Sequence, residues 1–218
     1  VYRPLHKRKD ASLHIGAAFS YRNPKASSTD GYNAIRYSSR NTTGINRKKF
    51  LDTDAIQYLD HELAWTAELA GHWKGLRWEG AYIARKPFVD ESKSPITDIT
   101  PAWGWYVQAG YLLFGGHQNY DAGGAKYTRT NNGRKWGDIE LCARVEYANF
   151  NISKYCMGGS AYAYSLGLNF HVTKNVKFVV NYQYNDNDIF ANGKGKQNGK
   201  DAGKFYTGYN AEGKPTDF

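Results

Sequence analysis

The chain has 218 residues, and its 29 lysines and arginines against 20 aspartates and glutamates give a formal net charge of +9. This balance favours an anionic partner, whether a nucleic acid, an acidic lipid surface or a small anion such as phosphate. No run of residues approaches the roughly 18 apolar residues of a membrane helix, so helical membrane spans are excluded. The 18 tyrosines and 6 tryptophans predict a mostly β structure.

Apolar and polar residues alternate in segments of about seven to eleven residues, the length that a tilted strand needs to cross a bilayer. In the first segment, 12–21, one face consists of Leu13, Ile15, Ala17, Phe19 and Tyr21. The same period recurs in 35–41, 59–69 and 76–82. Because the link 72–75 is short, the last two segments are predicted to form a tight hairpin.

The second half of the chain continues the alternation in three segments, at 105–113, 139–147 and 164–184. The last of them is predicted to be a hairpin that turns near 173–175. Arg144 shares its polar face with Glu140 and Glu146, so we expect it to be ion-paired. Together these segments predict eight strands and no helix.

Two architectures fit this pattern. A soluble β-sandwich buries the apolar faces of two sheets and leaves the polar faces in water. A membrane barrel turns the apolar face to lipid and encloses the polar face around water. Tyrosine and tryptophan lie near strand ends, as at Tyr21, Trp105 and Tyr147. This placement favours the barrel, because a bilayer interface holds amphipathic rings.

The stretch 35–41 combines this alternation with two arginines. On a strand, Arg36, Ser38 and Arg40 share one face, and Ile35 and Tyr37 share the other. In a barrel, we expect the apolar pair to face lipid and the arginines to face a water-filled lumen. Guanidinium groups bind phosphate oxygens through two hydrogen bonds and keep their charge, so they would form neighbouring weak anion sites. The alternative is a solvated face whose arginines pair with Glu62 or Glu68 of the next strand.

A second basic group lies in the segment 115–136. If 72–75 and 173–175 are periplasmic turns, this segment lies on the periplasmic side, where barrels keep connections short. A long segment there has a reason to fold into the lumen, and Lys126 and Arg129 would be its useful charges. The alternative is an ordinary exposed basic loop.

Other chemistry finds little support in the sequence. Cys142 and Cys156 either form one disulfide or are unpaired packing residues, and they lack metal-ligand spacing with the six histidines. No P-loop, nucleophile elbow or zinc-protease motif is present, so we expect no cofactor, no metal and no catalytic residue. Pairs such as Glu62 and Glu68 leave a carbohydrate-active enzyme on a sandwich fold as an alternative. Nucleic acid is not expected as a partner, because tyrosines and basic residues fall on opposite faces.

Seven stretches, in order, resemble the second half of the phosphate-selective porins O and P of Gram-negative outer membranes. They are "LHIGAAFSYR", "IRYSSRNTTGINRKKFLDTDAI", "HELAWTAELAGHWKGLRWEGAYIA", "GWYVQAGYLLFGG", "GAKYTR", "WGDIELCARVEYANFN" and "AYSLGLNFHVTKNVKFVVNYQYND". The resemblance covers roughly residues 11 to 190. It implies a barrel of about sixteen strands, usually a homotrimer in outer-membrane lipid, that passes phosphate and related polyanions along an arginine ladder to a lysine-lined constriction.

On this resemblance, residues 1–218 would be one partial barrel domain, the C-terminal half without its last strand. Residues 185–218 would form an extracellular loop. Arg36, Ser38, Arg40, Lys126 and Arg129 would line the anion path. The Arg-Pro-Glu expected at the end of the ladder is here Arg40-Asn41-Thr42, which leaves a general non-specific porin as the alternative.

Overall fold

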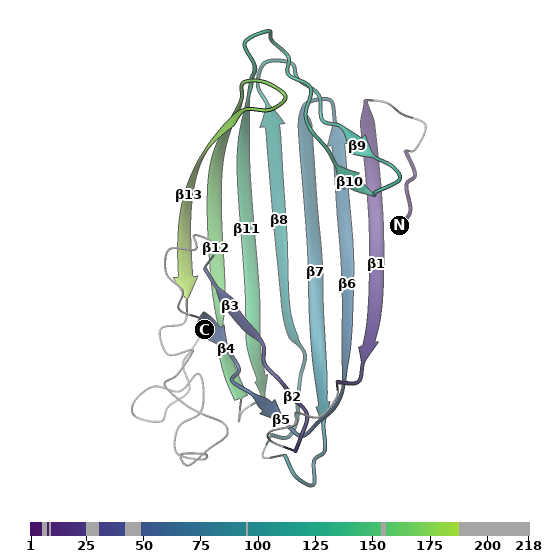
Figure 1. Cartoon of the computed structure of the whole chain (residues 1–218), viewed down its shortest axis with the longest axis vertical. Coiled ribbons are helices and arrows are strands. Elements are labelled where there is room, and N and C mark those ends of the chain that lie inside the picture. The colour runs from purple at the N-terminus through teal and green to yellow at the C-terminus, as the bar shows by residue number, and fades with distance from the viewer. Residues whose placement is uncertain are drawn as a thin grey trace.

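The structure is a computed structural model, and it describes residues 1–5, 8, 10–24, 31–41, 49–94, 96–153 and 156–187. Seven long antiparallel strands form one sheet in the order β1-β6-β7-β8-β11-β12-β13 (Figure 1). Their bounds are β1 Ala11–Arg22, β6 Leu59–Trp73, β7 Leu76–Val89, β8 Ala102–Leu112, β11 Asp138–Ser153, β12 Cys156–His171 and β13 Lys177–Asn187. The described residues contain no helix, so none of them forms a helical membrane span. The predicted all-β antiparallel fold is confirmed.

The strand register separates the sheet into a polar and an apolar face, as the alternation predicted. One polar row runs across five strands through Glu79, Gln108, Arg144, Ser165 and Gln183. The adjacent row, on the opposite face, consists of Gly80, Val107, Val145, Tyr164 and Tyr184. Large apolar side chains on that second face are exposed, including Phe19, Leu166 and Val180. Such an open apolar face is typical of a wall that meets lipid.

The strand connections at one end of the sheet include two tight turns. Lys74 and Gly75 alone join β6 to β7, and residues 172–176 join β12 to β13. Lys74 has a φ of 52°, in the left-handed region that two-residue hairpins require. Both predicted hairpins are confirmed, and the two turns lie at the same end of the sheet (Figure 1).

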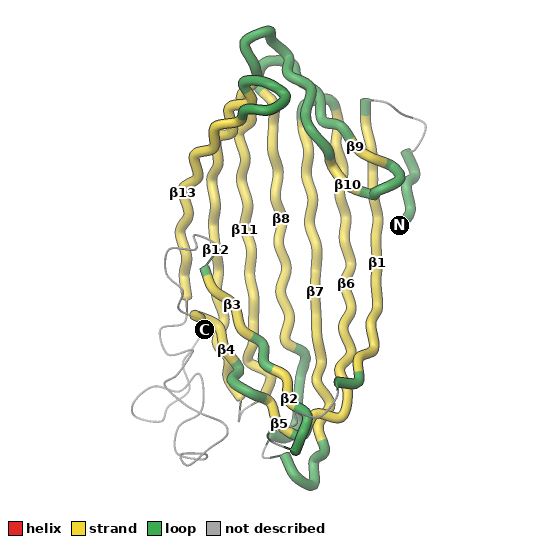
Figure 2. Tube along the Cα trace, viewed as in Figure 1, coloured by secondary structure: helices red, strands yellow, loops and turns green. Residues whose placement is uncertain are grey.

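The described residues 31–41 and 49–58, which precede β6, lie against the polar face, and we call them the first inner loop. It contains two short ladders, β2 (Ala34–Ile35) with β5 (Ile56–Gln57) and β3 (Ser38–Arg40) with β4 (Lys49–Asp52). Figure 2 shows these strands crossing in front of the sheet. The prediction that 35–41 is a sheet-spanning strand is therefore wrong, and the sheet has seven long strands in its described part.

The apolar side of this loop packs onto the sheet. Tyr37 and Ile56 are buried in a cluster with Ile96, Ala102, Ile152 and Cys156, and Ile35 packs against its edge. The expectation that Ile35 and Tyr37 face lipid is therefore wrong. Their alternation with the arginines reflects a loop that has one side on the wall and the other side exposed. A period of two shows which residues share a face, but it does not show what that face contacts.

Residues 113–137, between β8 and β11, form a second inner loop at the end with the tight turns. It carries the short pair β9 (Tyr120–Asp121) and β10 (Lys126–Tyr127). The Tyr120 hydroxyl lies 2.5 Å from Nδ1 of His14, which stands on the polar face of β1. The basic segment 115–136 thus folds onto the polar face, which is the first of the two alternatives that the sequence left open.

Asp138 closes this second inner loop. Its buried carboxylate accepts backbone hydrogen bonds from Phe114, Gly116 and Gly133 at 2.9 to 3.0 Å, and from Ile139 at 2.8 Å. Both arms of the loop are therefore tied to one side chain. Four N–H donors satisfy a carboxylate that would otherwise be costly to bury.

The two cysteines are unpaired. Cys142 lies on β11, and Cys156 is buried in the apolar cluster beneath the first inner loop. The disulfide alternative is therefore wrong, and both thiols serve as packing groups.

Candidate functional site

Three arginines on the polar face of the sheet are each paired with a glutamate. The nitrogen–oxygen distances are 3.2 Å for Arg77 and Glu140, 2.7 Å for Arg85 and Glu62, and 2.6 Å for Arg144 and Glu146. The expected pairing of Arg144 is confirmed. Because each positive charge faces a carboxylate, these arginines add little net charge to the wall, and charge selectivity must come from elsewhere.

Glu62 lies where the first inner loop meets the wall and is 1% exposed. Its Oε2 accepts a hydrogen bond from Arg85 at 2.9 Å, Nε of Arg85 lies 2.7 Å from Oε1, and Oε1 accepts a hydrogen bond from the Tyr37 hydroxyl at 2.8 Å. The Arg85 guanidinium in turn lies 5.3 Å from the centre of the Tyr37 ring. Burial and the hydrogen bond to Glu62 raise the pKa of the Tyr37 phenol, so it remains a donor at all ordinary pH values.

Glu140 holds the equivalent place under the second inner loop and is 2% exposed. Its carboxylate accepts from Gln118 of the loop at 3.3 Å and from Asn169 at 3.0 Å, and it lies 3.1 Å from Nε2 of His171. With Arg77, four side chains surround this buried charge. Each inner loop is thus bound to the wall through one buried glutamate.

The predicted ligand Arg36 is engaged within the first inner loop. Its Nε donates to Oδ1 of Asp52 at 2.7 Å, its terminal nitrogen bonds the other oxygen of Asp52, and Asp54 lies 3.6 Å away. The hydrogen bonds from Arg36 to Asp52 raise the pKa of the guanidinium. The partner is neither Glu62 nor Glu68, so that predicted pairing is wrong. Arg36 is charged, but much of its field is cancelled locally.

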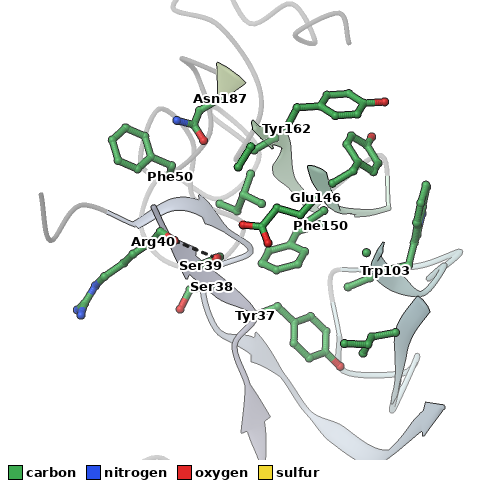
Figure 3. A pocket seen from close by; sticks show the side chains of 18 of the residues that line it. Tyr37, Ser38, Ser39, Arg40, Phe50, Trp103, Glu146, Phe150, Tyr162 and Asn187 are labelled. Atoms are coloured by element: carbon green, nitrogen blue, oxygen red, sulfur yellow. Dashed lines mark hydrogen bonds between the residues drawn. The ribbon is translucent and has the colours of Figure 1, made fainter. Parts of the chain in front are cut away.

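Ser38 and Arg40 lie on the exposed side of the β3–β4 ladder. Figure 3 shows their side chains extending away from a cavity of about 440 Å³ between the loop and the wall, whereas Glu146 points into it. Arg40 pairs in the ladder with Lys49. Among the residues that the structure describes, neither cation makes an ion pair. Two like charges on facing strands are unfavourable unless an anion lies beside them.

Lys126 and Arg129 are exposed on the second inner loop. Lys126 lines a cavity of about 340 Å³ together with the wall residues Glu68 and Glu79. Arg129 lines another of about 470 Å³, which Lys174 and Lys177 share. In the described part of the chain, neither Lys126 nor Arg129 is in an ion pair. The predicted residues therefore fall into two groups, one on each inner loop.

Several residues of this arrangement were not identified from the sequence. Lys49 lies outside the alternating segments, Lys174 lies in the predicted turn of the last one, and Asp52 and Gln118 are recognisable only once the loops are folded. Arg85 could have been found, because the two-residue turn at 74–75 fixes the β6–β7 register. That register pairs Glu62 with Pro87 and places Arg85 diagonally across from Glu62.

Comparison with known proteins agrees with this geometry. The family model described as phosphate-selective porin O and P matches residues 1–204. The chain belongs to this family. Porin O of Pseudomonas aeruginosa is 25% identical over 220 residues, which cover 91% of this chain and 49% of that protein. The chain therefore spans about half the length of the curated relative that it matches.

Membership of a porin family decides between the architectures left open by the sequence. Porins are channels, so the carbohydrate-active enzyme and the soluble sandwich are both excluded. The seven-stranded sheet is part of a membrane barrel, and such barrels turn a polar face to the lumen and an apolar face to lipid. Both inner loops lie on the polar face of the wall.

Proposed function

We propose that the protein forms a water-filled, anion-selective channel for phosphate or polyphosphate in the outer membrane of a Gram-negative bacterium. The observation that carries the proposal is the separation of charge on the lumen side. The wall arginines are paired with glutamates, whereas Arg40, Lys49, Lys126 and Arg129 project from the inner loops without ion-pair partners among the described residues. A path bounded by these loops attracts anions.

The passage of anions follows from the chemistry of the cations on the two inner loops. At the first inner loop, the Arg40 guanidinium offers two parallel donors to a phosphate, Lys49 adds a point charge, and Ser38 adds a hydroxyl donor. At the second inner loop, Lys126 and Arg129 repeat the attraction nearer the end with the tight turns. Two groups of exposed cations favour entry yet hold an anion weakly enough to release it.

A general, non-specific porin is the second candidate. The neutralisation of Arg36 by Asp52 and Asp54 favours it, because one of the two ladder arginines is then a weaker anion ligand. The absent Arg-Pro-Glu points the same way. The two candidates differ in phosphate block, which only a channel with phosphate sites shows.

Planar-bilayer recording of the complete native polypeptide tests the proposal. We expect a reversal potential that favours chloride over potassium, and millimolar phosphate should reduce the chloride conductance. A preference for chloride without phosphate block would leave the general porin. A preference for potassium would refute both the phosphate assignment and the anion path.

We also propose that further strands complete the barrel and that it assembles as a homotrimer in outer-membrane lipid. The open apolar face and the two edge strands support this, because lipid does not tolerate an unpaired edge. Among the described residues, β13 has no strand on its outer side and β1 has only the bridge from Tyr2 to Ile15. Residues 185–187 belong to β13, and the rest of the proposed extracellular loop, 188–218, lies outside the described residues. Intact mass and native cross-linking of the detergent-extracted protein test the barrel size and the trimer.

A further inference from the structure

We propose that Glu62 is a positioning residue for anion passage: through Tyr37 it seats the first inner loop on the wall and so sets where Arg40 and Lys49 stand. The inference rests on the proposed function, because these two cations matter only if anions pass beside them. Glu62 and Tyr37 are 1% and 5% exposed, so they do not touch a permeating anion themselves.

The contacts of Glu62 make it a strong tether. Arg85 donates to Oε2 at 2.9 Å and its Nε lies 2.7 Å from Oε1, and Arg22 lies 3.9 Å from Oε2. The arginines compensate the cost of burying this charge and fix its orientation. The Tyr37 hydroxyl then donates to an acceptor that is both charged and immobile, which makes the hydrogen bond stronger than one between neutral groups.

The tether is transmitted along the loop backbone to the cations. The Tyr37 amide donates to Oγ1 of Thr53 at 3.0 Å, and the Thr53 amide donates to the Tyr37 carbonyl at 3.0 Å. These bonds join the two arms of the β3–β4 ladder, which continues to the pair of Arg40 and Lys49. A shift of the Tyr37 side chain therefore moves the whole hairpin that carries the two cations.

Another polar contact between the loop and the wall joins the Cys156 thiol of β12 to the Thr53 carbonyl oxygen at 3.6 Å, and a thiol is a weak donor. The pair of Arg36 and Asp52 is internal to the loop and moves with it. Asn33 and Leu59 form hydrogen bonds at the base of the loop, and the β2–β5 pair separates them from the cations. The Tyr37 hydroxyl, in contrast, crosses from the hairpin to the sheet. Apolar packing around Tyr37 presses the loop onto the wall, while this bond selects one position.

The first test is Tyr37→Phe in the complete native polypeptide, recorded in planar bilayers. The ring and its packing remain while the tether is lost. We expect phosphate block to weaken by about three- to tenfold, as for the loss of one hydrogen bond to a charged group. Tyr182→Phe, on the exposed apolar face, is the matched control and should leave the block unchanged. Unchanged block in Tyr37→Phe would overturn the inference.

A double-mutant cycle separates positioning from general loosening of the barrel. If Tyr37 acts through Arg40 and Lys49, then Tyr37→Phe should have no further effect in a variant in which both cations are replaced by Ala. Additive effects of the two changes would show that Tyr37 works by another route and would overturn the inference. Glu62→Gln keeps an oxygen acceptor for the hydroxyl but removes its charge. Its effect on phosphate block should likewise depend on the presence of Arg40 and Lys49. Heat-modifiable gel mobility confirms that each variant is a folded barrel.

A readout without phosphate distinguishes failure of this inference from failure of the proposed function. Should the wild-type channel show no block by phosphate, the proposed function fails, and the position of the loop is still measured directly. In a Cys142→Ser background, Ser38→Cys is modified by a charged thiol reagent, and Tyr37→Phe should change that rate at least threefold, as expected for a loss of this size. An unchanged rate would mean that the tether does not position the loop.

Discussion

Arg36 and Asp52 form an ion pair inside the first inner loop, with Nε of Arg36 2.7 Å from Oδ1 of Asp52. Asp52 is the ladder partner of Ser38, so this carboxylate stands within the group of residues predicted to line the anion path. Its negative charge offsets one arginine where the proposed channel needs positive charge. The strength of anion binding in the loop is therefore set by a carboxylate as well as by its cations.

Replacing Asp52 with Asn tests this balance. Arg36 loses its nearer charged partner, keeps only Asp54 at 3.6 Å and becomes more available to a passing anion, so chloride selectivity should rise and phosphate block should strengthen by about two- to tenfold. Asp90→Asn is the control, because it removes an equal charge from a carboxylate that pairs with Lys93 in the connection after β7. Equal effects of the two changes would mean that only net charge matters.

Removing the cations themselves should have the opposite effect. Arg40→Ala with Lys49→Ala takes two charges from a confined path, where screening is weaker than at an open surface, and phosphate block should weaken by roughly tenfold or more. Arg40→Lys alone should retain part of the block, since the charge stays while the two parallel donors are lost. Lys86→Ala is the control, because Lys86 is the ladder partner of Leu63 on the apolar face. Unaltered phosphate block in the double variant would mean that the phosphate site lies at Lys126 and Arg129 instead.

The two faces of the sheet could be predicted from sequence because they depend on a local property. Side chains alternate strictly along a strand, and a register that keeps every polar row together is strongly specified. The rows through Glu79 and Gly80 therefore appear in the structure as the alternation predicts. The tight turn at Lys74 fixes that register for β6 and β7.

The inner loops could be predicted only in part. The alternation of Ile35 and Tyr37 with the arginines was real, yet the apolar side meets the inner wall instead of lipid. Sequence period reports which residues share a face, and the identity of the opposing surface depends on the path of the chain. The pairing of Arg36 with Asp52 likewise depends on the β3–β4 ladder. Strands of three and four residues are too short for their pairing to be recognised from the sequence.

Asp138 should control the seating of the second inner loop. In Asp138→Asn, an amide group replaces one acceptor oxygen and faces backbone donors that now lack a partner. We expect a loss of about 1 to 3 kcal/mol in local stability, measured by amide hydrogen exchange at Gly116 and Gly133. Asp121→Asn, at the end of β9 in the same loop, is the control, because its carboxylate accepts a backbone hydrogen bond from Gly123 in the following turn. Equal protection of both amides in wild type and Asp138→Asn would contradict this role.

Alkaline pH should release the second inner loop before the barrel unfolds. Burial raises the pKa of the Tyr127 phenol to about 12, above its ordinary value of about 10. A phenol whose pKa is raised by folding contributes stability that is fully present below pH 10 and is lost as the pH rises through 12. Protease cleavage within 113–137 should therefore accelerate between pH 10 and 12. Phenylalanine cannot ionise. When each cleavage rate is divided by the same protein's rate at pH 9, the rate for Tyr127→Phe should therefore rise less than the wild-type rate between pH 10 and 12. Equal acceleration in both proteins would assign the alkaline transition to another group.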